Sequence, residues 1–366
     1  MEKKNKKVVV AMSGGVDSSV TALLLQKEGY DIIGITLKTW GYEDFPEKDS
    51  GCCSLEAIYN ARNVAMKLGI PHYTLDFTER FNETVISNFI NEYLSGNTPN
   101  PCVLCNKVIK WGALLEKAQA LGADYIATGH YAKLRFDENI KRYIVSVAKD
   151  KTKDQSYALW QVSQSAFSKT ILPLGNYTKS EIRQIAREFG LKTADTPDSQ
   201  EICFVPNDNY RELLEIRVPE KMKAIKNGDI IYKGKKVGEH QGYPYYTIGQ
   251  RRGLNVSLGK PVYVSRIDAE NNIIYLDDKE GLFHTTFIAR DINLIKYPKI
   301  EGQFPADVKV RYKDSASPAV IEQIDETQIR VKFLQPKKSI TPGQSAVFYE
   351  DDDVIGGGII SKVIED

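Results

Sequence analysis

The sequence lacks the features that would direct a chain to a membrane or out of the cell. No apolar stretch approaches the roughly 20 residues that a membrane-spanning helix needs. The Lys-rich start, MEKKNKK, runs directly into the apolar VVVAM without the pattern of a cleavable signal. We therefore expect a cytoplasmic protein with no membrane partner.

The chain also lacks a large net charge of either sign, because 49 Lys and Arg residues nearly balance 48 Asp and Glu residues and leave a net charge of +1. A nucleic-acid partner would have to be bound by a local basic surface. Cysteine is scarce and odd in number: Cys52, Cys53, Cys102, Cys105 and Cys203. In an intracellular chain of 366 residues, this argues against a disulfide scaffold and favours thiol chemistry or metal binding.

The first half of the chain alternates strand-like and helix-like patterns. Strands are predicted at residues 7–12, 31–37, 72–76 and 124–128, and helices at 18–28, 55–68, 79–94 and 107–121. A further helix at 179–189 has Thr178 as its N-cap, Glu181 at the capping-box position and Gly190 as its terminator. This alternation predicts a doubly wound α/β domain with a parallel sheet.

The pattern changes after a short predicted helix at 210–216. From about residue 229, short strand-like runs alternate with Gly, Pro, Asn and Asp turns, which predicts a small mostly-β domain followed by a barrel or sandwich. Since 366 residues exceed what one core usually supports, we expect three domains. They are an α/β domain at 1–208, a small central domain at 209–281 and a C-terminal β-barrel at 282–366.

A glycine-rich loop, Ser13-Gly14-Gly15-Val16-Asp17-Ser18-Ser19, follows the first predicted strand and opens a helix. The glycines allow a sharp turn, the serines add hydroxyl donors and the helix N-terminus favours an anion, so the loop predicts a phosphate site. It fits neither the Walker A pattern nor the dinucleotide fingerprint. We assign Asp17 to Mg²⁺, because a carboxylate suits a phosphate site only when a hard cation bridges the two. Leu37 and Gly129 end two predicted strands where such a sheet holds its ligand, although each could be plain core or turn.

A second motif is Cys102-Val-Leu-Cys105, in a proline-marked loop that leads into a helix. A thiol at a helix N-terminus has a lowered pKa, so its thiolate is available as a nucleophile or metal ligand. Cys203 lies far downstream. A single CxxC pair is open to redox, zinc and iron–sulfur interpretations.

Together these segments resemble known enzymes. The glycine-rich loop is similar to the pyrophosphate loop (PP-loop) of N-type ATP pyrophosphatases, which cleave ATP to an adenylate and pyrophosphate. Over nearly its whole length, and in order, the chain resembles the tRNA-specific 2-thiouridylase (MnmA) family. The resemblance is carried by the loop and by residues 51–56, 98–107, 127–132, 153–157, 199–205, 247–253 and 311–312.

The resemblance implies an adenine nucleotide alpha hydrolase-like first domain and an activity on the wobble uridine of the tRNAs for Lys, Glu and Gln. ATP adenylates the C2 oxygen, sulfur from a donor attacks C2, and AMP leaves; the donor would be a cysteine desulfurase, a relay protein or inorganic sulfide. Cys105 corresponds to the nucleophile and Cys203 to the persulfide carrier. The implied ATP contacts are Ala11, Met12, Ser13, Gly14, Gly15, Val16, Asp17, Ser18, Leu37 and Gly129. Asn100, Pro101 and Cys102 would face the target base, and Lys153, Asp154, Gln155, Arg311 and Tyr312 would touch tRNA.

One position departs from the family pattern, because many members carry aspartate where this chain has Cys102. A general acid/base role there is in doubt, since a thiol has a different acidity. Two mechanisms follow. Either a Cys203 persulfide supplies sulfur and Cys105 releases it with a transient disulfide, or Cys102, Cys105 and Cys203 hold a [4Fe–4S] cluster whose open iron binds sulfide. We favour the cluster.

Other readings stay open at this stage. For Cys52 and Cys53 we favour a structural or incidental role, and His130 is either polar and functional or a satisfied, partly buried histidine. The stretch at 243–253, with several Tyr residues, Arg251 and Arg252, suits stacking on RNA as well as an ordinary hairpin surface. The competing functions are another PP-loop adenylating enzyme, like lysidine synthetase or GMP synthetase, and a non-catalytic ATP-dependent RNA-binding protein.

Overall fold

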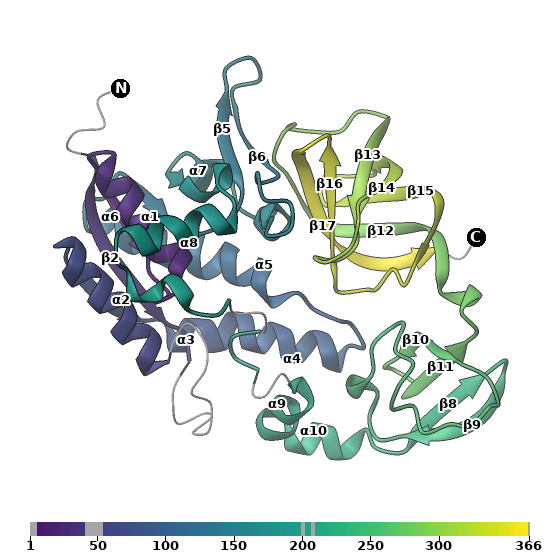
Figure 1. Cartoon of the computed structure of the whole chain (residues 1–366). Coiled ribbons are helices and arrows are strands. Elements are labelled where there is room, and N and C mark those ends of the chain that lie inside the picture. Colours follow the sequence, from purple (N-terminus) through teal and green to yellow (C-terminus); the bar gives the residue numbers. More distant parts are fainter. Residues whose placement is uncertain (1–5, 41–53, 199–201, 206–208, 365–366) are drawn as a thin grey trace.

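The first sheet lies in the N-terminal part of the chain. The computed structural model describes residues 6–40, 54–198, 202–205 and 209–364 (Figure 1). Five strands pair in the order β3-β2-β1-β4-β7, and every pair is parallel. They are β1 (Lys7–Ala11), β2 (Asp31–Lys38), β3 (His72–Asp76), β4 (Tyr125–Ala127) and β7 (Thr170–Ile171). The strand order reverses between β1 and β4, and such a switch point is where open α/β sheets bind ligands.

Helices cover both faces of this sheet. Val8 and Val10 face a core made with α1 (Val16–Lys27), α2 (Leu55–Leu68) and α8 (Lys179–Glu188). Val9 alternates to the other face, where it joins a core with Trp111, Leu114 and Ala118. The doubly wound prediction is therefore confirmed. The capping box of Thr178 and Glu181 is also confirmed, and it begins α8.

Two long helices contain π turns. The first runs through α3 (Thr78–Phe81), η1 (Asn82–Ile86) and α4 (Ser87–Leu94), and the second through α5 (Pro101–Cys105), η2 (Asn106–Leu114) and α6 (Leu115–Ala120). The predicted start of the second helix at residue 107 was wrong. It begins at Pro101, a favourable first position because proline has no N–H to leave unpaired. Cys102 and Cys105 therefore lie in the helix and not in a preceding loop.

The C-terminal barrel is built from six strands and is joined by a hairpin of the α/β domain. The sheet order is β12-β15-β14-β13-β16-β17-β6-β5, and pairing of β12 with β17 closes the barrel. The unpredicted hairpin attaches where Ser146 pairs with Asp353, and Arg135 binds both Asp353 oxygens at 2.8 Å. The strands are β5 (Lys133–Asp137), β6 (Arg142–Ser146), β12 (Phe283–Leu294), β13 (Gln303–Lys309), β14 (Ser317–Gln323), β15 (Gln328–Lys338), β16 (Ser345–Glu350) and β17 (Asp353–Ile364).

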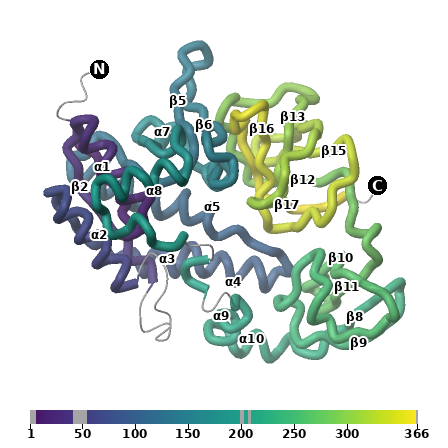
Figure 2. Tube along the Cα trace, viewed as in Figure 1, coloured from purple at the N-terminus to yellow at the C-terminus, as the bar shows by residue number. Residues whose placement is uncertain are grey.

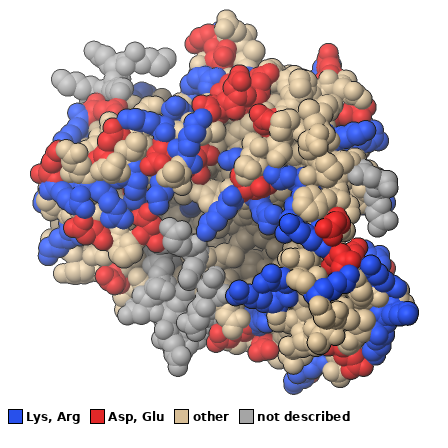
Figure 3. Space-filling view, turned by 45° about the vertical axis from the view of Figure 1, so that its right-hand side comes forward, with Lys and Arg blue, Asp and Glu red and all other residues tan. Residues whose placement is uncertain are grey.

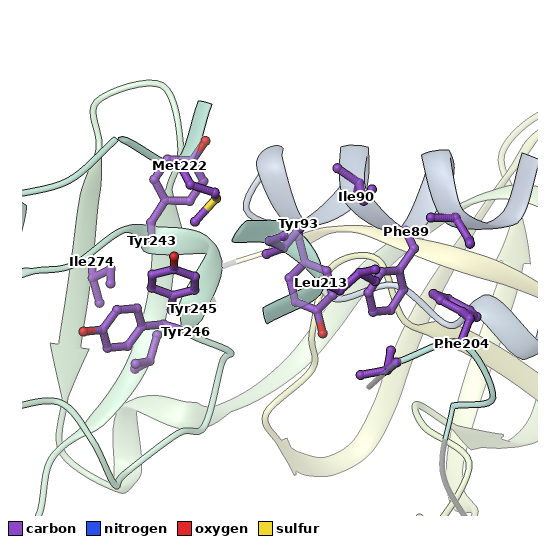
Figure 4. Close-up of a cluster of buried hydrophobic side chains, with 14 of the residues drawn as sticks. Phe89, Ile90, Tyr93, Phe204, Leu213, Met222, Tyr243, Tyr245, Tyr246 and Ile274 are labelled. Carbon is purple, nitrogen blue, oxygen red and sulfur yellow. The ribbon is translucent and has the colours of Figure 1, made fainter. Parts of the chain in front are cut away.

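The small central domain lies beside the end of α4 (Figures 1 and 2). Its sheet order is β10-β11-β8-β9. An apolar cluster joins it to the α/β domain: Phe89 and Tyr93 of α4 belong to the same core as Tyr243 and Ile274 (Figure 4). The strands are β8 (Gly228–Tyr232), β9 (Lys235–His240), β10 (Tyr263–Asp268) and β11 (Ile273–Asp277), preceded by α9 (Tyr210–Arg217) and α10 (Pro219–Ala224).

Short helical segments complete the described chain: α7 (Gln164–Phe167), η3 (Ser156–Leu159), η4 (Pro173–Asn176), η5 (Lys192–Asp195), η7 (Tyr243–Tyr245) and η8 (Glu280–Leu282). Among the described residues, no helix has both the length and the apolar character needed to cross a bilayer.

Candidate functional site

The glycine-rich loop joins the carboxyl end of β1 to α1. Gly14 has a left-handed φ of 75°, and a Cβ there would lie 2.1 Å from the Ala57 carbonyl oxygen, so only glycine suits this position. Gly15 is the N-cap of α1, and no described side chain caps this helix end. The N–H groups of the first turn are therefore available to bind an anion.

Serine hydroxyls hold the loop in shape. Ser18 Oγ accepts from the Ser13 N–H at 3.1 Å and donates to the Gly15 carbonyl at 3.2 Å. Ser19 Oγ donates to the same carbonyl at 2.8 Å. Because both hydroxyls form hydrogen bonds inside the loop, the backbone N–H groups are its main hydrogen-bond donors to a bound anion.

The Asp17 carboxylate is held by two side chains from distant elements. Lys179 Nζ, from α8, lies 2.8 Å from each carboxylate oxygen, and the Tyr131 hydroxyl donates to Oδ1 at 2.8 Å. Burial and the Asp17 charge raise the pKa of Tyr131, which keeps it a neutral donor. Among the described residues, Oδ2 accepts only from Lys179 and so keeps a lone pair. A carboxylate oxygen is a ligand that Mg²⁺ prefers, and Asp17 fits the predicted role.

Lys179 also contacts a second carboxylate. Its Nζ lies 2.8 Å from Asp198, which in turn pairs with Lys153 at 2.8 Å and Arg183 at 3.0 Å. Partial burial alone would raise the pKa of Asp198, but its ion pairs with Lys153 and Lys179 lower it to about 2. The sequence analysis did not single out Lys179, Arg183 or Asp198, since no local pattern links them to the loop.

Gly129 and Leu37 lie where the sequence analysis expects. A Cβ at Gly129 would lie 3.0 Å from both the Asp17 Cβ and the Ser18 nitrogen, so the first turn of α1 packs directly on this glycine. Leu37, near the end of β2, packs against the cluster that also contacts Cys105 and Cys203. Both positions therefore border the loop or the cysteines, and their contact with ATP stays a prediction.

The cysteines of the candidate sulfur site come from two segments. Cys102 and Cys105 lie in α5, and Cys203 lies in the short stretch 202–205; Cys102 is exposed, and Cys105 and Cys203 are half-buried. Phe204 anchors that stretch, because its ring packs edge-on against Phe81 and Phe89 at 5.5 and 5.2 Å between centroids (Figure 4). Cys105 and Cys203 thus contact one hydrophobic cluster.

A metal-holding group is not seen among the described residues. Across residues 6–40, 54–198, 202–205 and 209–364, no three His, Cys, Asp or Glu side chains are grouped so that they could hold a metal ion. The favoured [4Fe–4S] arrangement of Cys102, Cys105 and Cys203 therefore stays a prediction. Cys52 and Cys53, for which we predict a structural role, lie outside the described residues.

The expected fall in thiol pKa does not hold at Cys102. Its side chain reaches solvent, but the surrounding protein desolvates the thiol and raises its pKa, and the charge of Lys110 opposes this rise only in part. Desolvation therefore outweighs the effect of the helix N-terminus, where α5 begins at Pro101.

The charge of Lys110 acts on both Cys102 and His130. Lys110 lies in η2 and has no ion-pair partner in the described chain. His130 is buried, its Nδ1 lies 2.7 Å from Thr128 Oγ1, and burial followed by the Lys110 charge holds its pKa well below the usual value. These contacts support the structural interpretation of His130. The sequence analysis missed Lys110, because a π turn is not visible in the residue pattern.

Comparisons with known proteins cover all three parts of the chain. Family models match as the tRNA methyl transferase HUP domain over residues 6–207, the tRNA methyl transferase PRC-barrel domain over 212–278, and the aminomethyltransferase beta-barrel domain over 284–360. The tRNA-specific 2-thiouridylase MnmA of Salinibacter ruber is 51% identical over 99% of this chain and 96% of that protein. The corresponding proteins of Amoebophilus asiaticus and Natranaerobius thermophilus are 52% and 50% identical, each over 98% of this chain and over 96% and 98% of their own lengths.

The chain belongs to the tRNA-specific 2-thiouridylase family. The full-length match confirms the resemblance and the three-part fold, and separates the chain from the lysidine synthetases and GMP synthetases that share the loop. As a 2-thiouridylase family member, it belongs to a family of ATP-using enzymes.

In this 2-thiouridylase fold, several of the residues expected to touch tRNA also have contacts within the protein, and Lys153 is paired with Asp198. The buried Asp154 carboxylate accepts from the N–H groups of Ala148 and Ser156 at 3.0 and 3.2 Å, and its carbonyl accepts from the Tyr312 hydroxyl at 3.0 Å. Gln155 Oε1 accepts from the Tyr131 N–H at 3.0 Å. Lys153, Arg311 and the exposed part of Tyr312 remain the better candidates for RNA contact.

Asn100 lies where α5 meets the barrel. It hydrogen-bonds the buried Tyr157 hydroxyl, which donates to the Ser345 carbonyl at 2.7 Å. A cavity of about 60 Å³ opens beside Asn100, between α4, α5 and the barrel. A larger groove of about 270 Å³ lies in the central domain, lined by Arg251 and Lys260 among others.

Proposed function

We propose that this protein is a tRNA-uridine 2-sulfurtransferase that converts the wobble uridine of the tRNAs for Lys, Glu and Gln to 2-thiouridine. The observation that carries the proposal is full-length identity of about half to proteins named tRNA-specific 2-thiouridylase. The PP-loop and the cysteines support it, because the reaction needs an activating nucleotide beside a sulfur nucleophile.

In the first step, the C2 oxygen of uridine attacks the α-phosphorus of ATP, and pyrophosphate leaves. The N–H groups at the start of α1 would bind the phosphates, with Ala11–Ser18, Leu37 and Gly129 around the nucleotide. Mg²⁺, when bound at Asp17, would neutralise phosphate charge. A carbonyl oxygen is a poor leaving group, and adenylation makes it a good one.

In the second step, the terminal sulfur of a Cys203 persulfide bonds to C2, and the former C2 oxygen leaves with AMP. Cys105 thiolate attacks the inner sulfur, which breaks the bond to the transferred sulfur and leaves a Cys105–Cys203 disulfide. A dithiol reductant must then restore the thiols. The contact of both cysteines with one hydrophobic cluster supports this route. Asn100, Pro101 and Cys102, at the start of α5, would face the base.

The cluster route has a direct test. Anaerobic purification with iron and sulfide analysis should give an active, iron-free protein if the persulfide route operates. Stoichiometric iron whose removal abolishes thiolation would reverse this choice. The sulfur donor, a cysteine desulfurase, a relay protein or inorganic sulfide, can be identified in the same reconstituted assay.

A basic surface supports tRNA binding. Lys and Arg side chains gather around a hollow on one face, between the α/β domain and the central domain (Figure 3). Arg251 and Lys260 line the groove of the central domain, which offers positive charge to the RNA backbone. Lys153, Arg311 and Tyr312 are proposed contacts on the catalytic side, with Asp154 and Gln155 shaping that loop.

Mass analysis of the wobble uridine tests the function most directly. In tRNA from a strain that lacks the gene, 2-thiouridine should be missing from the Lys, Glu and Gln isoacceptors and return when the gene is restored. Purified protein should form AMP only when these tRNAs are present. ATP binding without AMP formation would indicate a non-catalytic RNA-binding protein instead.

Two further assignments complete the proposal. We divide the chain at 1–208, 209–281 and 282–366, a division supported by the limits of the three matched regions. We place the protein in the cytoplasm, where its tRNA substrates are aminoacylated.

A further inference from the structure

The ATP loop has no cation of its own. Residues Ser13–Ser19 contain an aspartate and no Lys or Arg, whereas a Walker A loop carries its own lysine. A polyanionic nucleotide approaching this loop would meet the Asp17 carboxylate. Besides the Mg²⁺ proposed at Asp17, a cation from another part of the chain can offset that charge.

Lys179 is placed to do so. It is 9% exposed, and its ammonium lies 2.8 Å from both Asp17 oxygens. It stands in the first turn of α8, whose capping box fixes where the helix begins. Burying a lysine costs free energy unless its charge is paired, and the two carboxylates that Lys179 contacts provide that pairing.

Asp198 is the second anchor of Lys179 and extends the network. It pairs with Lys153, Lys179 and Arg183, so three cations meet the Asp17 and Asp198 carboxylates beside the loop, and the Asp150 carboxylate accepts from the Lys179 N–H at 3.0 Å. Asp198 also lies five residues before Cys203 in the sequence. The same lysine therefore connects the ATP loop with the segment that carries the sulfur.

We propose that Lys179 is a positioning residue for the adenylation step: through Asp17 it orients and neutralises the acidic side of the PP-loop, and Asp198 holds it in place. The ammonium is preorganised before the nucleotide arrives, so no reorganisation is needed when charge builds up at the phosphates. Lys179 thereby provides from α8 the cation that the loop lacks.

The test is AMP formation with the purified full-length protein, ATP, Mg²⁺ and unmodified tRNA transcript. Lys179→Met should lower kcat by about 100-fold, the usual cost of losing one preorganised electrostatic group, with a smaller change in KM for ATP. Lys179→Arg should recover at least about a tenth of the activity, because the charge is kept. Asp198→Asn should weaken adenylation less than Lys179→Met does.

Lys149→Met is the matched control. Lys149 pairs at 2.8 Å with Glu181, which lies in the same turn of α8 as Lys179, but Lys149 does not contact Asp17. The Lys149→Met variant should therefore keep activity near that of the unmodified protein. Thermal unfolding without ATP separates a folding defect from a positioning defect. Lys179→Met with unchanged kcat, an equal loss in Lys149→Met, or a loss explained by unfolding would overturn the inference. Failure of the unmodified protein to form AMP would instead contradict the proposed function.

Discussion

The ATP loop and the candidate sulfur site differ in how completely they are assembled. The loop has its turn, its serine bonds and its aspartate in place, held by Lys179 and Tyr131. Within the described parts of the chain, the cysteines belong to no metal-holding group, and Cys102 has a raised pKa. The contacts that hold the proposed adenylation site are therefore formed in this structure, and we propose that bound tRNA completes the sulfur site.

A physical reason accounts for this difference. An activated uridine is prone to hydrolysis, and a reactive thiolate is prone to oxidation. An enzyme that completes its sulfur site only with the substrate bound avoids both losses. The contacts of the loop, which are formed in this structure without tRNA, fit such a sequence of events.

The largest effect should come from Asp17→Ala. Removing the carboxylate leaves Lys179 buried with Asp198 as its remaining partner and removes the predicted Mg²⁺ ligand, so AMP formation should fall by at least about 1,000-fold. Pyrophosphate release in the presence of tRNA measures it. Asp195→Ala, on an exposed aspartate paired with Arg187, should have almost no effect. Near-normal AMP formation by the Asp17→Ala variant would show that the loop is not the preformed adenylation site described above.

Cys203→Ser should separate the two steps. The serine cannot carry a persulfide, so 2-thiouridine should be undetectable by mass analysis, while AMP formation should stay within about threefold of the unmodified protein because no PP-loop contact changes. Equal loss of both steps would mean that the two sites are one cooperative unit, contrary to the difference described above.

Phe204→Ala should loosen the cysteine segment. Deleting a ring that is 2% exposed and packs against Phe81 and Phe89 should lower the free energy of unfolding by about 3–5 kcal/mol. Thiolation should fall more than AMP formation, because the anchor is next to Cys203 and not next to the loop. Denaturant unfolding and both product assays measure this. Phe136→Ala, at a partly exposed ring in β5, is the control; an equal change in both variants would show that Phe204 is not a special anchor.

The difference between the ATP loop and the candidate sulfur site also explains which features could be predicted from the sequence. The loop is one contiguous segment, and the parallel sheet follows from local periodicity, so both were predicted. Lys179 and Asp17 are 162 residues apart, and Asp353 joins Ser146 of the hairpin across 207 residues. No local pattern encodes such contacts. The pKa of Cys102 was predicted in the wrong direction, because its helix position is visible in the sequence and its desolvation is not.

The smallest effect should come from Lys110→Met, and it tests the sulfur side alone. The Lys110 charge stabilises the Cys102 thiolate and so lowers a pKa that burial has raised. Without it, the pKa should rise further, because desolvation would then act unopposed by this charge. Less thiolate would then exist at any given pH, and the midpoint for alkylation of Cys102 should move to higher pH. Iodoacetamide labelling across pH, followed by mass spectrometry in a Cys105→Ser and Cys203→Ser background, measures the midpoint. Lys107→Met, at an exposed lysine of the same helix, should leave it unchanged. An unchanged midpoint would show that Lys110 does not act on this thiol, and burial alone would then account for its raised pKa.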